Sequence, residues 1–219
     1  MNRIAQLFIR IMGALLMGRI YEFVTGPALW AAFAIFIGGL IVRVTYLYAL
    51  SRKPKGATDN HVDLKRAFRA ICHWLVPLGN SAGLRSQPVF ATVSFVFHIC
   101  LLGVPLFVFA HNTLWEEAFN FSLPSLPDFF SDALTVVFLI SALLLLAGRA
   151  VHAKARSLST ARDYCLILLS SAPFVTGFLA YRQIGPYKPT LVLHIVFAEI
   201  LLVIIPFSMG HLVLFFRGK

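Results

Sequence analysis

Four histidines interrupt two long apolar stretches of this sequence. They are His98 within residues 88–110, His111 at the outer end of that stretch, and His194 and His211 within residues 190–216. A neutral imidazole is the commonest metal ligand in proteins, whereas a polar side chain within a membrane is costly unless it has a partner. Two histidines at two depths of one apolar segment, matched by two in another, indicate a pair of bis-histidine haem sites.

The elements that must position these histidines are membrane helices. Hydrophobic residues make up 59% of the 219 residues and charged residues only 13%, about half the charged fraction of a typical soluble domain. Five segments are long enough to cross a bilayer, at about residues 27–50, 88–110, 133–150, 164–181 and 190–216. The sequence therefore predicts an all-α integral membrane protein, a five-transmembrane-helix bundle that forms one domain over residues 1–219.

The first 26 residues predict an amphipathic helix on the outer membrane surface. Arg3, Arg10 and Arg19 divide its apolar residues, which recur at steps of three and four, and no small-residue cleavage site follows. A cleavable signal peptide is therefore not expected. Gly26-Pro27 marks the start of the first span.

The basic residues behind the net charge of +10 are spread unevenly along the chain, in a pattern that indicates the membrane topology. Lysine and arginine gather in residues 51–87, in residues 149–162 and at the C-terminus, whereas residues 111–132 contain four acids and no basic residue. The positive-inside rule places the basic segments in the cytoplasm, so five spans leave the N-terminus outside. We expect a multi-pass protein of the bacterial cytoplasmic membrane with a periplasmic N-terminus, and no nucleic-acid binding.

The three cysteines do not form a redox or cluster motif. Cys72, Cys100 and Cys165 are far apart, and neither C-x-x-C nor C-x-x-C-H occurs. This spacing argues against an iron–sulfur cluster, a thiol redox pair and covalently attached haem. Any haem would be bound non-covalently.

The direction of the helices pairs the histidines by depth. The second span runs outward and the fifth inward, which places His98 level with His211 and His111 level with His194. The separations are 13 and 17 residues, or about 20 and 26 Å of helix rise, and a kink at Pro105 would bring His98 and His111 onto one face. The alternative is that the histidines hydrogen-bond between helices, or line a proton path in a haem-free transporter or scaffold.

Three further ionisable residues are candidates for a role beside the histidines. Arg43 and Arg85, near the cytoplasmic end of the bundle, suit a haem propionate, because a guanidinium fork matches a carboxylate; the alternative is a topology charge. Glu199, the acid deepest in a span, is a candidate for a quinone site or proton relay, or for a hydrogen bond to a neighbouring helix. Gly103 offers a flat patch where a macrocycle could approach.

Several short motifs carry a resemblance to a known family. They are Phe97-His98-Ile99, Asp163-Tyr164, Thr176-Gly177, Pro206-Phe207-Ser208-Met209-Gly210-His211, and Gly26-Pro27-Ala28-Leu29-Trp30 followed by Gly38-Gly39 and Arg43. In these motifs the chain resembles the cytochrome b (gamma) subunit of respiratory nitrate reductase. It is most similar to the related membrane cytochrome b subunits of transmembrane redox complexes of sulfate reducers. The resemblance covers most of the chain, although the nitrate reductase type has its two second-span histidines closer together.

The resemblance implies a dihaem electron-transfer subunit of a respiratory complex used in anaerobic respiration. The haem b ligands would be His98, His111, His194 and His211. The outer-face partner would be a periplasmic multihaem cytochrome or the quinone pool, and the inner partner a cytoplasmic iron–sulfur protein. Menaquinone is left open as a second cofactor.

Overall fold

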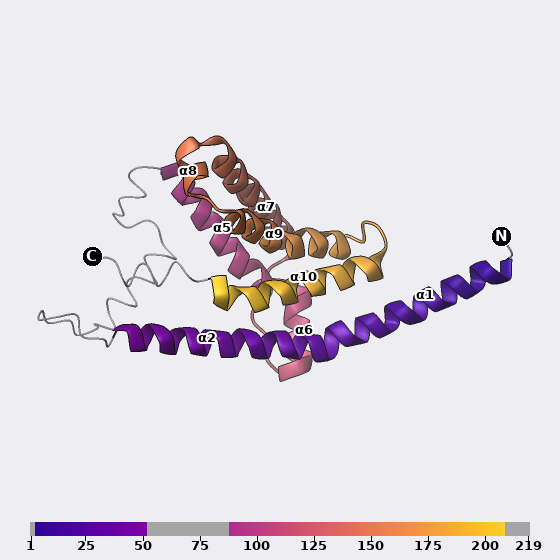
Figure 1. The fold of residues 1–219 in the computed structure, drawn as a ribbon. Coiled ribbons are helices and arrows are strands. Elements are labelled where there is room, and N and C mark those ends of the chain that lie inside the picture. Colours follow the sequence, from indigo (N-terminus) through magenta and orange to yellow (C-terminus); the bar gives the residue numbers. More distant parts are fainter. Residues whose placement is uncertain (1–2, 52–87, 209–219) are drawn as a thin grey trace, which may run out of the picture. The chain divides into compact units, whose positions relative to one another are not determined.

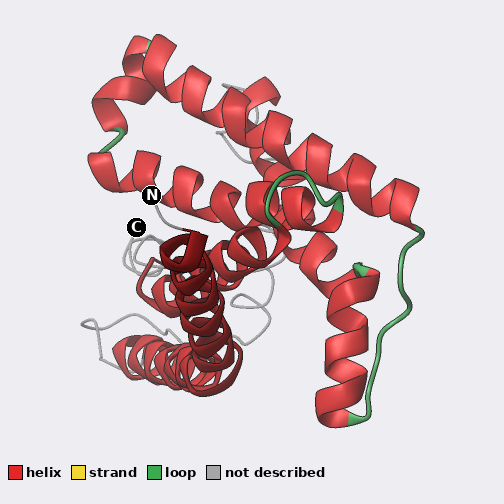
Figure 2. Ribbon diagram, turned by 90° about the vertical axis from the view of Figure 1, so that its right-hand side faces the viewer, coloured by secondary structure: helices red, strands yellow, loops and turns green. Residues whose placement is uncertain are grey.

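The structure is a computed structural model that describes residues 3–51 and 88–208. Within these ranges it is helical and contains no strand (Figure 2). The helices are α1 (Arg3–Phe23), η1 (Val24–Ala28), α2 (Leu29–Ser51), α5 (Pro88–Phe107), α6 (Phe109–Phe119), α7 (Asp128–Val151), α8 (Ala153–Leu158), α9 (Ala161–Tyr181) and α10 (Tyr187–Ser208).

Five apolar helical segments are long enough to cross a membrane, which confirms the predicted fold class. Within the described ranges they are Met12–Tyr46, Pro88–Phe107, Asp128–Val151, Ala161–Tyr181 and Tyr187–Ser208. Each has at least the roughly 20 residues that a bilayer crossing requires. The predicted N-terminal helix is also present, as α1.

Gly26-Pro27 does not separate α1 from the first span, as the sequence had suggested. Pro27 lies inside η1, a single π-helical turn that joins α1 and α2 into one continuous helix (Figure 1). A proline in an α-helix cannot donate to the carbonyl four residues earlier, and its ring clashes with it. A wider π turn accommodates the ring by inserting one residue. The helix is therefore widened at Pro27 and does not end there.

The chain folds as two compact units. One consists of Met1–Val62 and Val175–Lys219, and the other of Asp63–Phe174. In the first unit, α10 lies along α2 (Figure 1). Their closest approach is at Gly39, where a Cβ atom would lie 2.8 Å from Cβ of Pro206. Two helix backbones come this close only where one of them lacks a side chain.

The second unit packs around a stack of three phenylalanines. Phe138 of α7 is fully buried. Its ring stacks against Phe97 of α5, with centroids 4.8 Å apart, and against Phe174 of α9, at 3.8 Å. Offset ring stacks of this kind contribute about 0.5–1.5 kcal/mol each beyond the burial of their area. The stack fixes the rotation of α5 and therefore the direction of the neighbouring His98.

Candidate functional site

His98 lies within α5 and is half-buried. Its Nδ1 lies 2.6 Å from the backbone carbonyl oxygen of Ser94, one turn earlier. A carbonyl oxygen can only accept, so Nδ1 is the protonated ring nitrogen and donates. The Nε2 atom is then the one that can bind a metal, which is the usual arrangement of a ligating histidine.

His111 has the same arrangement, although it lies on a different helix. It belongs to α6, and its Nδ1 lies 2.9 Å from the carbonyl oxygen of Pro105, to which it donates. Burial lowers the pKa of His111, and the bond to Pro105, which raises it, is the weaker effect. The neutral ring therefore presents Nε2 as a potential metal ligand.

The predicted second span of residues 88–110 with a kink at Pro105 is corrected by the structure. The helix α5 ends at Phe107, and Val108 is extended, with φ −72° and ψ 135°. A new helix then begins at Phe109 and carries His111. The proline lacks an N–H and weakens the helix there, and the chain breaks three residues later. A break lets the direction of His111 be set independently of His98.

His194 lies in α10 and packs against the backbone of α9. A Cβ atom on Gly177 would lie 2.8 Å from Nδ1 of His194 and 2.9 Å from its Cε1. Real Cβ atoms do not approach other heavy atoms so closely, so a glycine is required beside this imidazole. The contact also places the end of α9 beside α10, as expected for antiparallel neighbours joined by a short turn.

Two predicted site residues, His211 and Arg85, lie outside the described residues. Of the remaining candidate ligands, the second unit contains His98 and His111, and the first unit contains His194. The pairing of the histidines by depth therefore stays a prediction.

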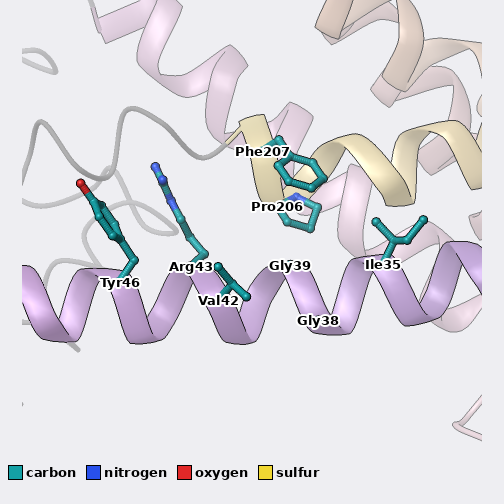
Figure 3. Close-up of a pocket in the computed structure, with 8 residues that line it drawn as sticks. All are labelled: Ile35, Gly38, Gly39, Val42, Arg43, Tyr46, Pro206 and Phe207. Atoms are coloured by element: carbon teal, nitrogen blue, oxygen red, sulfur yellow. The ribbon is translucent and has the colours of Figure 1, made fainter.

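Arg43 lines a pocket between α2 and α10 (Figure 3). The pocket has a volume of about 590 Å³ and is lined by Ile35, Gly38, Gly39, Val42, Arg43, Tyr46, Pro206 and Phe207. Arg43 and Tyr46 project from the same side of α2, on which Pro206 and Phe207 also lie. Gly38 leaves part of the lining open, whereas Pro206 packs against Gly39, and Arg43 supplies a cation to the lining. This combination suits an apolar, flat group that carries a carboxylate.

Glu199 is buried in α10, with 9% of its surface exposed. Its Oε1 atom has no hydrogen-bond partner among the residues that the structure describes. It lies seven residues, or about two turns, before Pro206 and therefore on the face of α10 that meets α2. Its offset of five residues from His194 rotates it by roughly 140°. Glu199 and His194 therefore point in different directions.

A haem would require fewer protein ligands than a metal ion held by protein side chains alone. No group of three or more His, Cys, Asp or Glu that could hold a metal ion occurs in the described ranges. A bis-histidine haem needs only two axial nitrogens from the protein, because the macrocycle provides the other four. His98 and His111 each donate from Nδ1 to a backbone carbonyl, so each would supply one axial nitrogen, of two different haems, through Nε2.

Sequence reasoning missed Asn112, the residue that follows His111. It is only 3% exposed and makes four hydrogen bonds around the break between α5 and α6. Gly177 was selected from the sequence only as part of the Thr176-Gly177 motif, and its contact with His194 was not predicted. The signal for Asn112 was an uncharged amide two residues beyond an apolar run that ends at Ala110, a pattern too common in loops to be selected by spacing alone.

Comparison with known proteins shows a relative of this chain. A protein from Nitratidesulfovibrio vulgaris (strain Hildenborough), described as "Protein", is 41% identical over 204 residues, which cover 91% of this chain and 90% of the relative. No family model and no solved structure matches the chain. An identity this high over nearly the full length of both chains is diagnostic of common descent and a shared fold.

Proposed function

We propose that this chain, which belongs to the same family as the relative from Nitratidesulfovibrio vulgaris, is the dihaem cytochrome b subunit of a respiratory membrane complex. It would pass electrons across the bacterial cytoplasmic membrane. The outer-face partner would be a multihaem cytochrome or the quinone pool, and the cytoplasmic partner an iron–sulfur protein.

The observation that carries this proposal is the shared hydrogen-bond pattern of two histidines. His98 and His111 each donate Nδ1–H to a backbone carbonyl, of Ser94 and Pro105 respectively. Each bond selects one tautomer, orients the ring and makes Nε2 more basic. An oriented, neutral ring whose Nε2 carries no proton is what an axial haem ligand requires.

The four histidines would hold two haems in pairs. His98 and His211 form the cytoplasmic-side pair in this proposal, and His111 and His194 form the outer pair. A bis-histidine haem b supplies reversible one-electron transfer at its iron. The chain's part is to fill both axial positions, to exclude water with apolar side chains and to space the pairs along the membrane normal.

Arg43 and Arg85 would hold propionates at the cytoplasmic end. Arg43 is well placed for this, because it lines a pocket that Gly38 leaves partly open. A guanidinium beside a propionate compensates its charge and stabilises the reduced iron, since reduction adds a negative charge.

Glu199 is the candidate proton relay for a quinone site. A buried carboxyl group whose Oε1 lacks a hydrogen-bond partner within the described residues is costly in a membrane helix and marks a functional position. It supports menaquinone as a second, separate cofactor. It also supports the competing function, a haem-free transporter or scaffold in which ionisable residues carry protons.

A reduced-minus-oxidised visible spectrum of the purified protein separates these two functions. The dihaem subunit gives the sharp α-band of low-spin haem b. A transporter or scaffold, expressed in a haem-replete host, gives a flat difference spectrum, and that result would exclude the proposal.

A further inference from the structure

The break between α5 and α6 leaves three backbone carbonyls without their usual helical donors. In a continuous helix the carbonyls of residues 105, 106 and 107 would accept from the N–H groups of residues 109, 110 and 111. The extended conformation of Val108 prevents this. Buried carbonyls require other donors, because an unsatisfied one costs about 1–3 kcal/mol.

Each of these carbonyls accepts a hydrogen bond from outside the helical ladder. Pro105 accepts from Nδ1 of His111 at 2.9 Å. Leu106 accepts from Nδ2 of Asn112 at 3.3 Å, and Phe107 accepts from the backbone N–H of Leu126 at 2.8 Å. The break therefore supplies the carbonyl that orients His111.

Asn112 joins both sides of this break to the loop that follows α6. Its Nδ2 also donates to Oγ of Ser125 at 3.2 Å and approaches the carbonyl of Val108 at 3.4 Å. Its Oδ1 accepts from the backbone N–H of Leu123 at 3.0 Å. The amide thus both donates and accepts, and no other side chain of its size can do both with this geometry.

We infer that Asn112 is a positioning residue for the outer haem ligand His111. It holds the end of α5, the start of α6 and the loop of residues 121–126 in one arrangement, in which the Pro105 carbonyl faces the imidazole. This inference rests on the proposed ligand role of His111. Asn112 itself would not touch the haem.

The test uses two variants of the full-length, haem-loaded protein. Asn112→Leu removes both hydrogen-bonding functions, and Asn112→Asp retains the acceptor for Leu123 but sets a carboxylate oxygen against the carbonyls of Leu106 and Val108. We expect both to shift the EPR g values of one low-spin haem, because these report the orientation of the axial imidazoles. The midpoint potential of that haem should rise, since a weaker Nδ1–H bond makes the ligand less basic. The second haem should be unchanged.

Asn120→Gly is the matched control. Asn120 lies in the same loop, is exposed and has a positive φ of 53° that glycine adopts without strain. Its replacement should leave both haem signals unchanged.

Two results would overturn the positioning role. Unaltered g values and potentials in both Asn112 variants would show that His111 is oriented without the amide, and an equal loss of both haems would show a purely structural role. The proposed function is tested separately by His111→Ala. If that variant loses one haem while Asn112→Leu changes neither, only the positioning role falls.

Discussion

Gly177 of α9 and His194 of α10 are in contact so close that no larger residue fits at position 177. A Cβ atom there would lie 2.8 Å from Nδ1 of the imidazole. The absent side chain lets the ring lie against the backbone of α9, which restricts its rotation. The Thr176-Gly177 motif therefore acts through His194, the residue proposed as a ligand of the outer haem.

Gly177→Ala should weaken or abolish binding of the outer haem, because the added methyl group displaces the His194 ring. A displacement of this kind costs about 1–3 kcal/mol in a packed interior, which corresponds to a roughly tenfold to hundredfold loss of affinity. The measurement is the haem content and the reduced-minus-oxidised spectrum. Gly148→Ala is the control, since its Cβ would make only ordinary contacts, with Phe90 at 3.7 Å and His152 at 4.0 Å. Equal haem content in the two variants would show that the contact does not position a ligand.

Gly39→Ala should destabilise the first unit. The new Cβ would lie 2.8 Å from Cβ of Pro206 and 3.0 Å from its Cγ, and overpacking of this kind costs about 1–3 kcal/mol. The neighbouring Gly38 has nothing within 4 Å, so Gly38→Ala should be neutral or stabilising through its higher helix propensity. The midpoints of thermal unfolding in detergent compare the stability of the two variants. Identical midpoints would contradict the close approach of α2 and α10.

Neutralising the cytoplasmic-side arginines should lower a haem potential. Arg43→Gln and Arg85→Gln each remove a cation, and a nearby cation favours the ferrous state because reduction adds negative charge. We expect at least one variant to lower the midpoint potential of the haem held by His98 and His211. Redox titration resolves the two haems. Unchanged potentials in both variants would leave these arginines as topology charges.

Much of the fold could be predicted from the sequence, because a membrane span needs about 20 apolar residues and little else. The five spans and the N-terminal helix followed from this rule. The end of α5 at Phe107 and the continuation of the first helix through Pro27 could not be predicted in this way. A proline weakens a helix, but it does not decide whether the chain breaks, kinks or widens there. That outcome depends on tertiary contacts, such as the bond from Leu126 to Phe107.

The candidate site was only partly accessible to the same reasoning. The histidines stand out because polar residues are rare in spans. Their carbonyl acceptors, the contact at Gly177 and the amide of Asn112 involve backbone atoms and a loop, which hydropathy and spacing do not describe. These features explain how His98, His111 and His194 are oriented, and the sequence had indicated only that they were present.

Pairing by depth predicts which histidine variants share a phenotype. His98→Ala and His211→Ala should remove the same spectral component, because either loss leaves one iron with a single axial ligand. His194→Ala and His111→Ala should both remove the other component. Low-temperature difference spectra of the four variants test this. If His111→Ala retained both haems at full occupancy, another group would have to face His194, and the assignment of His111 would be wrong.

The most direct test of the central claim is the haem content of the purified protein. A pyridine haemochrome assay, referred to protein concentration by amino-acid analysis, should give two haems b per chain. One haem per chain would restrict the proposal to a single histidine pair. No haem, from a host that loads other b-type cytochromes, would contradict the account.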